Sequence, residues 1–326
     1  MNKFGLVSVG VVAAASALGA ATPALSKEVV LRAANCFPVG SPPGKPFDRF
    51  VTLLNQKGKG VITAKVLGGA PAIGSPFTMT RRMARGAYDI IGCPDAYYGN
   101  VIQEAAAVRL MPFTATEARK NGAWAYFDKL LNAKGVKLLG QTHNFGPFYL
   151  FLSRPITQPD LTGLHLRVAP VYTPFFKSLG ATTQRSNFAQ VYTYMENGTV
   201  VGFGWPALGW NPSWAKVAKY WVEPGFYRAG IQTMMNLEKW NSLTTKQKNT
   251  LMAVVLEHEA TTEKWPERLD KQKKWMKSQG MKPIVFDKAG TAKWSKAALD
   301  AGWVDLVNKS PKHGVALRKM FEKAPN

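Results

Sequence analysis

The sequence predicts an α/β protein with two units, each a mostly parallel sheet flanked by helices. Short apolar runs alternate with helical patterns over residues 29–93, and the alternation resumes at residue 163. A helical pattern then runs from Thr244 to Gln279. Alternating strands and helices are typical of parallel sheets. A helix of that length, about 50 Å, exceeds one small domain and could span both units.

The first unit follows this order from its start. Two glycines, Gly68 and Gly69, end its second strand, and Gly86 ends its second helix. Thr114 and Glu117 have the spacing of a capping box, which begins a helix that Gly135 ends. The predicted strands are 29–34, 61–69, 88–93, 136–141 and 148–153, and the earlier helices are 46–57 and 77–86.

The second unit begins with Gly-Leu-His-Leu-Arg-Val-Ala-Pro at 163–170, a strand that Pro170 ends. Thr244 and Gln247 form another capping-box spacing at the start of the long helix, which Pro266 is expected to kink. The other elements predicted here are helices at 174–180 and 188–198 and a strand at 199–205.

The chain is strongly basic, with 42 Lys and Arg against 20 Asp and Glu among 326 residues. This excess favours an anionic partner, whether a small acid, a membrane surface or nucleic acid. The hydrophobic fraction of 46% excludes a disordered protein.

Residues 1–26 have the pattern of a secretory signal peptide: Lys3, a long apolar run, and Ala24 and Ser26 before a cut at Lys27. An uncleaved anchor is the alternative. Cleavage removes one lysine and leaves a net charge of +21. Export argues against nucleic acid, so we interpret the basic character as attraction for anions. The lysine-rich stretch 271–277 is better explained as a solvated helix face than as a docking patch.

Two cysteines, Cys36 and Cys93, each follow an apolar run. If both runs are neighbouring parallel strands, the cysteines lie close enough to pair. Export permits a disulfide without requiring one, and we expect two free, partly buried thiols.

Sequence motifs for catalysis or metal binding are lacking. The four histidines, His143, His165, His258 and His313, have no zinc spacing, and we find no GxSxG, Walker loop or local carboxylate pair. We therefore expect no metal, no cofactor and no catalytic residues, although catalytic groups can converge from distant segments.

Aromatic residues cluster beside glycine and proline where predicted strands end. In open α/β sheets, ligands bind just beyond the carboxyl ends of strands. Core packing explains any one of these residues, but the set favours a pocket lining of Phe37, Asp95, Tyr97, Tyr98 and Trp205.

Arg167 lies on the opposite strand face from Leu164, Leu166 and Val168. A guanidinium on a sheet covered on both sides is costly unless an anion meets it. The residues alone leave two partners open: a protein carboxylate or a ligand.

Two segments carry the most specific motifs: Asp-Leu-Thr-Gly-Leu-His-Leu-Arg-Val-Ala-Pro at 160–170, and 179–206, which contains Gln-Val-Tyr-Thr-Tyr-Met-Glu-Asn-Gly. Further motifs lie at 31–42, 66–74, 83–92 and 239–248. In these segments the mature chain resembles the substrate-binding proteins of TRAP transporters, the DctP family.

The resemblance implies a two-lobed periplasmic-binding-protein fold with a long C-terminal helix spanning the lobes. It implies that Arg167 pairs with the carboxylate of a small organic acid, and that the protein delivers this acid to a TRAP membrane permease from the periplasm. We expect a monomer, with a dimer left open. The expected lobes are 27–147 with about 231–275, and 148–230 with about 276–326.

Departures from the family pattern suggest the kind of acid. Pro147 or Phe148 stands where many members have a second arginine, Trp205 replaces an asparagine, and Val201 replaces an aspartate. Phe188 keeps a common aromatic wall. Rings replacing polar contacts favour an aromatic or apolar monocarboxylate, or a 2-oxo acid with a hydrophobic tail. Arg185 is a candidate replacement anion contact, although a surface role is favoured. The alternative functions are a secreted enzyme acting on a small acid, and a binding protein that feeds a sensor or a different class of permease.

Overall fold

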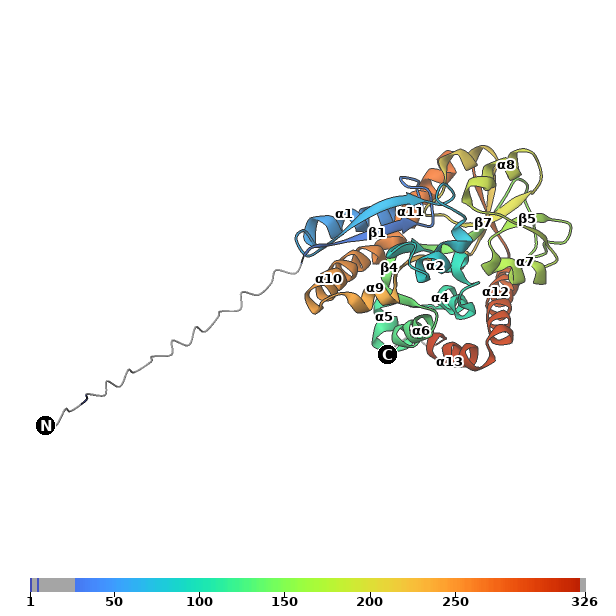
Figure 1. The fold of residues 1–326 in the computed structure, drawn as a ribbon. Coiled ribbons are helices and arrows are strands. Elements are labelled where there is room, and N and C mark those ends of the chain that lie inside the picture. Colours follow the sequence, from blue (N-terminus) through green and yellow to red (C-terminus); the bar gives the residue numbers. More distant parts are fainter. Residues whose placement is uncertain (2–4, 6–26, 323–326) are drawn as a thin grey trace.

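The computed structural model describes residues 1, 5 and 27–322, which form two lobes joined by one continuous ten-stranded sheet (Figure 1). The signal peptide predicted at 1–26 lies outside the described residues, apart from Met1 and Gly5.

The first lobe is built on three parallel strands, as predicted. β1 (Val29–Asn35) pairs with β2 (Ile62–Gly69) and with β3 (Ile90–Cys93). The connecting helices are α1 (Lys45–Lys57) and α2 (Pro76–Ala84). The helical spacing of α1 puts its apolar side chains on one buried face: Phe47, Phe50, Val51 and Leu54.

Four short helices follow β3, where the sequence predicted only one. Thr114 caps one of them in the expected capping box with Glu117. The predicted continuous helix to Gly135 is wrong, because Gly122 adopts φ 81° and interrupts it. The helices are α3 (Asp95–Tyr98), α4 (Ala106–Leu110), α5 (Ala115–Lys120) and α6 (Ala123–Asn132).

Two long antiparallel strands cross between the lobes. β4 (Val136–Leu152) pairs with β9 (Phe226–Asn236) from Val136 to Phe148, with bulges along the way. The sequence predicted two strands here and did not predict β9. The polar segment between the two predicted strands stays in the sheet because β9 supplies partners for its backbone groups. Residue patterns within one segment do not reveal such distant partners.

The second lobe holds β5 (His165–Val168) between two parallel neighbours, β6 (Thr182–Arg185) and β7 (Gly202–Pro206). The sheet order is β2-β1-β3-β9-β4-β7-β5-β6. Off this path, β8 (Tyr220–Glu223) pairs with β4 and with β10 (Lys282–Val285). The α-helices of this lobe are α7 (Thr173–Ser178) and α8 (Val191–Glu196). Its short 3-10 helices lie at Pro170–Tyr172, Phe188–Gln190 and Pro212–Lys216. In the first lobe, a 3-10 helix at Gln103–Ala105 lies between α3 and α4.

The predicted long helix is confirmed, including its break at Pro266. α10 (Thr245–Thr261) begins at the Thr244 capping box, and a 3-10 turn at Thr262–Lys264 leads into α11 (Trp265–Ser278). Pro266 has no N–H to donate to the Thr262 carbonyl, which instead accepts from Nη2 of Arg268 at 3.1 Å. α10 packs on α1, whereas α11 reaches β8 through an ion pair between Lys273 and Glu223.

Three further helices lie within residues 27–322: α9 (Leu237–Ser242), α12 (Lys288–Lys309) and α13 (Pro311–Phe321). α12 contacts α7 on one lobe and α4 on the other, and α13 packs against α4 and α6 (Figure 1). The carboxyl-terminal segment therefore returns to the first lobe.

Cys36 and Cys93 form a disulfide, so the expectation of two free thiols is wrong. Asn35 and Gly92 are opposite each other in the parallel β1–β3 ladder, which brings the two following residues side by side with their Cα atoms 5.0 Å apart. The bond links the two strand ends from which Phe37 and Tyr97 project.

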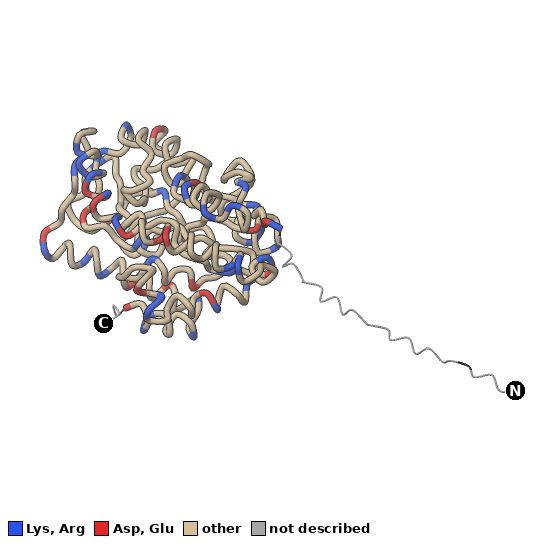
Figure 2. The backbone as a smooth tube through the Cα atoms, turned by 90° about the vertical axis from the view of Figure 1, so that its left-hand side faces the viewer, with Lys and Arg blue, Asp and Glu red and all other residues tan. Residues whose placement is uncertain are grey.

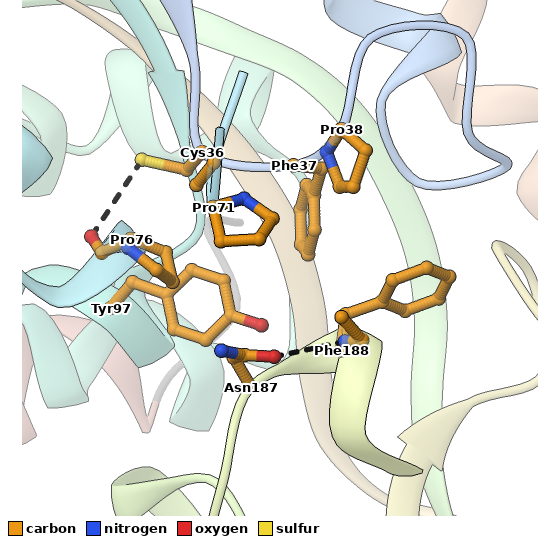
Figure 3. A pocket seen from close by; sticks show the side chains of 10 residues that line it. Cys36, Phe37, Pro38, Pro71, Pro76, Tyr97, Asn187 and Phe188 are labelled. Atoms are coloured by element: carbon orange, nitrogen blue, oxygen red, sulfur yellow. Dashed lines mark hydrogen bonds between the residues drawn. The ribbon is translucent and has the colours of Figure 1, made fainter. Parts of the chain in front are cut away.

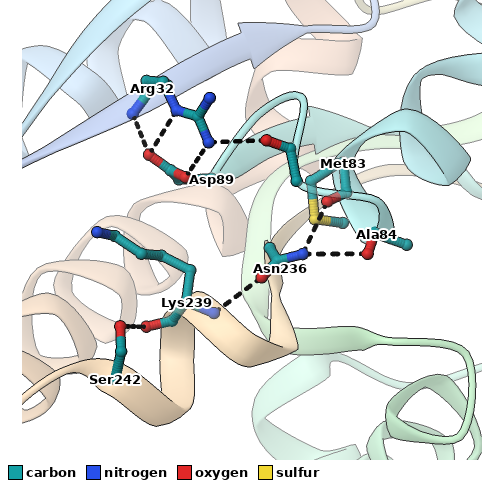
Figure 4. A network of polar contacts seen from close by, with 8 residues as sticks. Arg32, Met83, Ala84, Asp89, Asn236, Lys239 and Ser242 are labelled. Carbon is teal, nitrogen blue, oxygen red and sulfur yellow. Dashed lines mark hydrogen bonds and ion pairs between the residues drawn. The ribbon is translucent and has the colours of Figure 1, made fainter.

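A polar network joins the middle of β1, the residue before β3 and the last residue of β9 (Figure 4). Nη2 of Arg32 lies 2.8 Å from Oδ1 of Asp89, and the Asn236 amide donates to the carbonyls of Met83 and Ala84. Burial alone would raise the pKa of Asp89, but the hydrogen bonds and charge of Arg32 outweigh it and hold that pKa below its ordinary value.

Lys and Arg occur along the whole length of the molecule in the view of Figure 2, with Asp and Glu between them. In the part of the chain that the structure describes, no helix combines the length and the apolar character needed to cross a membrane.

Candidate functional site

Arg167 is fully buried near the middle of the second lobe's sheet. It lies on β5, whose Leu166 and Val168 project to the other face. Its Nε donates to Oγ of Ser186 at 3.0 Å and its Nη2 donates to the Ser186 carbonyl. Its Nη1 lies 3.1 Å from the hydroxyl of Tyr172 and 3.4 Å from the Gly204 carbonyl.

All of these acceptors are neutral. Among the described residues, no Asp or Glu forms an ion pair with Arg167. A buried charge without a countercharge is expensive. The interpretation of Arg167 as half of a structural ion pair is therefore wrong, and an anion from outside the chain would meet an uncompensated guanidinium.

Tyr97 brings an unsatisfied hydroxyl to the same place from the first lobe. It lies on α3, directly after β3, and its hydroxyl is buried without a hydrogen-bond partner in the structure. Burial raises the pKa of Tyr97 to about 12, although the nearby charge of Arg167 opposes the rise. The hydroxyl therefore keeps its proton at physiological pH and can donate it to an acceptor.

Aromatic rings from both lobes meet here, and Figure 3 shows Phe37 and Tyr97 of the first lobe near Phe188 of the second. From the first lobe, Phe37 lies 5.5 Å from Tyr97, 6.3 Å from Phe188 and 6.2 Å from Trp205, measured between ring centroids. In the second lobe, the Trp205 ring is 5.4 Å from that of Phe188 and 5.5 Å from Cζ of Arg167. The rings thus close the gap between the lobes in front of the guanidinium.

A small cavity remains inside this cluster, with a volume of about 30 Å³, enough for about two water molecules. Arg167 lies just behind its wall, bonded to Tyr172 and close to the ring of Trp205. The walls are almost wholly apolar, and both lobes and the crossing strands supply them: Phe37, Pro94, Ala96, Tyr97, Phe145, Phe148, Ala169, Tyr172, Trp205, Pro206, Ala229 and Gly230. We call this space the ring cavity.

The structure brings together most of the residues selected from the sequence. Phe37, Tyr97, Phe148 and Trp205 line the ring cavity, and Phe188 lines a smaller hollow next to it that shares Phe37 and Tyr97. These residues therefore surround one region between the lobes.

Two selected residues lie elsewhere. Tyr98 is fully buried, and its hydroxyl donates to Oε1 of Gln232 at 3.0 Å. Asp95 forms a buried ion pair with Arg109, with 2.9 Å between Oδ2 and Nε. Burial raises the pKa of Asp95, against the opposing charge of Arg109. Neither residue is among those that line the ring cavity, and each side chain is held by another protein side chain instead.

Sequence reasoning missed three residues that shape the site: Tyr172, Ser186 and Phe145. Tyr172 and Ser186 hold Arg167, and Phe145 lines the ring cavity from β4. Phe145 stands in the glycine- and proline-flanked stretch Asn-Phe-Gly-Pro-Phe-Tyr, where the signal was present. Ser186 follows β6, a strand that the sequence did not reveal.

Two of the residues that depart from the family pattern, Trp205 and Phe148, line the ring cavity, whereas Arg185 does not. Nε1 of Trp205 donates to the Gly209 carbonyl at 3.2 Å, so the indole presents a ring rather than a donor to the cavity. Phe148 likewise presents a ring. Arg185 is exposed, with its Cζ 3.9 Å from the ring centroid of Phe77, and it does not reach the ring cavity.

Metal binding has no support in residues 27–322, where no group of three or more His, Cys, Asp or Glu side chains is placed to hold a metal ion. His143 and His258 are both buried, and burial lowers the pKa of each.

A model of the bacterial extracellular solute-binding proteins, family 7 (DctP), matches residues 33–305. A curated solute-binding protein of Roseobacter denitrificans is 29% identical over 165 residues, which cover 48% of this chain and 49% of that protein. An uncharacterised protein of Sinorhizobium fredii is 27% identical over 176 residues, which cover 50% of this chain and 32% of that protein. The matches thus span half or less of the length of these curated relatives.

Several solved structures share the fold. A TRAP periplasmic solute-binding protein from Desulfovibrio salexigens with bound orotic acid has a TM-score of 0.77 at 17% identity, covering 90% of this chain and 97% of that one. A Bordetella pertussis extracytoplasmic solute receptor that binds pyroglutamic acid has a TM-score of 0.80 at 12% identity, covering 90% and 100%. The Roseobacter denitrificans protein with bound L-galactonate has a TM-score of 0.75 at 20% identity, covering 89% and 99%.

Proposed function

The chain belongs to family 7 of the bacterial extracellular solute-binding proteins, and from this premise we propose that it captures a small organic acid between its lobes and delivers it to a TRAP-type membrane permease. The observation that carries the proposal is the buried guanidinium of Arg167, which no acidic side chain of the described residues neutralises.

A ligand carboxylate would supply the missing charge. The planar fork of an arginine matches the two oxygens of a carboxylate, and charge-assisted hydrogen bonds are stronger than those to neutral acceptors. In this proposal the carboxylate takes over donors that Arg167 now directs to neutral oxygens. The carboxylate also accepts a hydrogen bond from the hydroxyl of Tyr97, which lies on the opposite lobe and has no partner among the described residues.

The walls of the ring cavity support an acid with a flat or apolar body. Phe37, Phe148, Phe188 and Trp205 offer ring surfaces, and the Trp205 N–H is already bonded. Each favourable ring contact adds about 0.5–1.5 kcal/mol beyond area burial. Orotic acid and pyroglutamic acid, bound by the Desulfovibrio and Bordetella proteins, are both cyclic acids.

Binding requires the lobes to move. The ring cavity, about 30 Å³, is far smaller than the ~300 Å³ or more that small-molecule pockets occupy. We propose that opening separates Phe37 and Tyr97 from Phe188 and Trp205, exposes Arg167, and admits the acid. Closure then expels water, which strengthens the charge pair in a lower dielectric.

The moving parts follow the expected lobes, which we propose as 27–147 with 231–275 and 148–230 with 276–310, leaving α13 with the first lobe because it packs there. β4, β9 and the α10–α11 helix connect the lobes and would bend. Export by a cleaved signal at 1–26, release into the periplasm and action as a monomer belong to the same proposal.

The test begins with mass spectrometry of any small molecule that co-purifies with the intact chain, followed by melting shifts with a panel of organic acids. Arg167→Met keeps volume and apolar packing while removing the charge, because well-packed apolar replacements of buried charges are tolerated. Arg154→Met, at an exposed arginine of the same lobe, is the control.

We expect Arg167→Met to fold and to lose the acid-induced shift, with Arg154→Met unchanged. Retention of the full shift by Arg167→Met would overturn the site. Recovery of the acid intact after incubation separates capture from catalysis, since a secreted enzyme would consume it.

A further inference from the structure

A second and larger cavity lies where the lobes meet, and Tyr97 lines both this cavity and the ring cavity. Its volume is about 220 Å³, against about 30 Å³ for the ring cavity. The two share only Ala96 and Tyr97 among their lining residues. The first lobe contributes Phe77 and Arg109, the second lobe contributes Val171 and Arg185, and α12 contributes Asp305 and Lys309.

Arg109 presents unused donors to this cavity. The residue is 4% exposed, and its Nε donates to Asp95 at 2.9 Å. Its two terminal nitrogens, Nη1 and Nη2, donate to no acceptor among residues 27–322. A guanidinium has five N–H donors, and those on Nη1 and Nη2 are available to a ligand or water in the cavity that Arg109 lines.

Arg185, a residue of the second lobe, contacts the first lobe. Its Cζ lies 3.9 Å from the ring centroid of Phe77, so a cation–π contact already joins the lobes at the rim of the cavity. No acidic side chain of the described residues forms an ion pair with Arg185. Its charge is therefore available to a ligand.

The remaining charges of the cavity nearly cancel. Lys309 lies 2.7 Å from Asp305, its neighbour one turn away on α12. The uncompensated charge comes from Arg185, and the free donors come from Arg109. Both groups stand beside the apolar surfaces of Phe77 and Val171. A carboxylate bound here would be attracted by the cations, and this attraction is stronger beside apolar walls because the local dielectric is lower than in water.

We infer that this cavity binds a carboxylate group between Arg109 of the first lobe and Arg185 of the second. The carboxylate belongs either to a second small acid or to a second acid group on the ligand held at Arg167. Because each lobe supplies one arginine, the bound group stabilises the closed arrangement. The contacts that argue for this site do not involve Arg167, and only the second source, an acid group on the ligand held at Arg167, rests on the proposed function.

The probe is 4-bromobenzoate, whose bromine reveals its position in crystals by anomalous scattering and whose affinity calorimetry measures. The variants are Arg185→Ala, at an exposed side chain, and Arg109→Lys, which keeps a cation beside Asp95 but removes the fork. Lys296→Ala is the matched control, because Lys296 pairs with Asp300 on α12 at the same spacing as Lys309 with Asp305 and does not line the cavity.

We expect probe density with its carboxylate between Arg109 and Arg185, and affinity for this site about tenfold weaker in Arg185→Ala and Arg109→Lys. Lys296→Ala should stay within about twofold of the wild type. If Arg167→Met abolishes one binding event and Arg185→Ala another, the acids are separate molecules. If titration of the co-purified ligand shows one event that both substitutions weaken, a single diacid spans the two sites.

Two results would overturn the inference: Arg185→Ala binding the probe as well as Lys296→Ala does, or probe density confined to the neighbourhood of Arg167. The proposed function would survive either result. Conversely, loss of the Arg185 event with no effect of Arg167→Met would keep this inference and reject the proposed function.

Discussion

Phe37 of the first lobe and Trp205 of the second meet edge to face across the interlobe gap, with ring centroids 6.2 Å apart. This contact stands directly in front of Arg167, whose Cζ lies 5.5 Å from the Trp205 ring. One indole therefore contacts both the ring of the opposite lobe and the guanidinium, and in the proposed capture mechanism ligand entry separates the two rings.

Replacing Arg167 by lysine tests whether the fork matters beyond its charge. A lysine keeps a positive point charge but loses the paired N–H geometry, and charged hydrogen bonds are worth about 1.5–3 kcal/mol. We expect Arg167→Lys to bind the co-purified acid about tenfold to a hundredfold more weakly by calorimetry. Arg154→Lys is the control, and equal affinity in the two variants would contradict the assignment.

Trp205→Asn should change which acids bind. It removes a ring that packs on Phe37 and Phe188 and introduces an amide with both donor and acceptor atoms. We expect benzoate to bind about tenfold more weakly and gluconate to gain relative to it, measured as the ratio of the two affinities. Trp240→Asn, which removes a ring outside the cleft, should leave that ratio unchanged. An unaltered ratio in Trp205→Asn would remove the case for a ring-bearing ligand.

Gly204→Ala should disturb the group that holds Arg167. A Cβ at position 204 would lie 2.5 Å from Cε2 of Tyr172, whose hydroxyl donates to the Gly204 carbonyl and contacts Arg167. We expect a loss of about 1–3 kcal/mol in the free energy of unfolding in urea, together with weaker acid binding. Gly99→Ala is the stability control, since the nearest atom there is 3.8 Å away. Wild-type stability and binding in Gly204→Ala would show that Tyr172 moves freely.

The Arg32–Asp89 pair predicts a loss of stability in acid. The pKa of Asp89 is held below its ordinary value in the folded protein. The contribution of Asp89 to the free energy of unfolding is therefore complete above its unfolded-state pKa, about 3.9. This contribution disappears as the pH falls through the lower pKa of the folded state. We expect Asp89→Asn to lower the melting temperature at pH 7 and to approach the wild type near pH 2.

The control for that experiment is Asp300→Asn, at an exposed carboxylate paired with Lys296 on α12, which should change the melting temperature little. A constant difference between wild type and Asp89→Asn over the whole acid range would show that the carboxylate stabilises the fold without titrating in this window.

Local patterns determined much of the architecture. The alternation of strands and helices in both units, the capping boxes at Thr114 and Thr244, and the break at Pro266 all follow from interactions within a few residues along the chain. The charge of Arg167, on a strand whose alternate residues Leu164, Leu166 and Val168 are apolar, is equally plain in the residue pattern. These features are legible in sequence because their physical causes are local.

The tertiary structure alone decided the rest. β4 continues through a polar segment because β9, far along the chain, supplies its partners, and the Cys36–Cys93 bond depends on the β1–β3 register. Asp95 belongs to Arg109 rather than to the ring cavity, and Tyr172 and Ser186 hold Arg167. Such choices depend on which distant groups meet when strands pair and lobes close, and residue spacing within a segment carries no information about those distances.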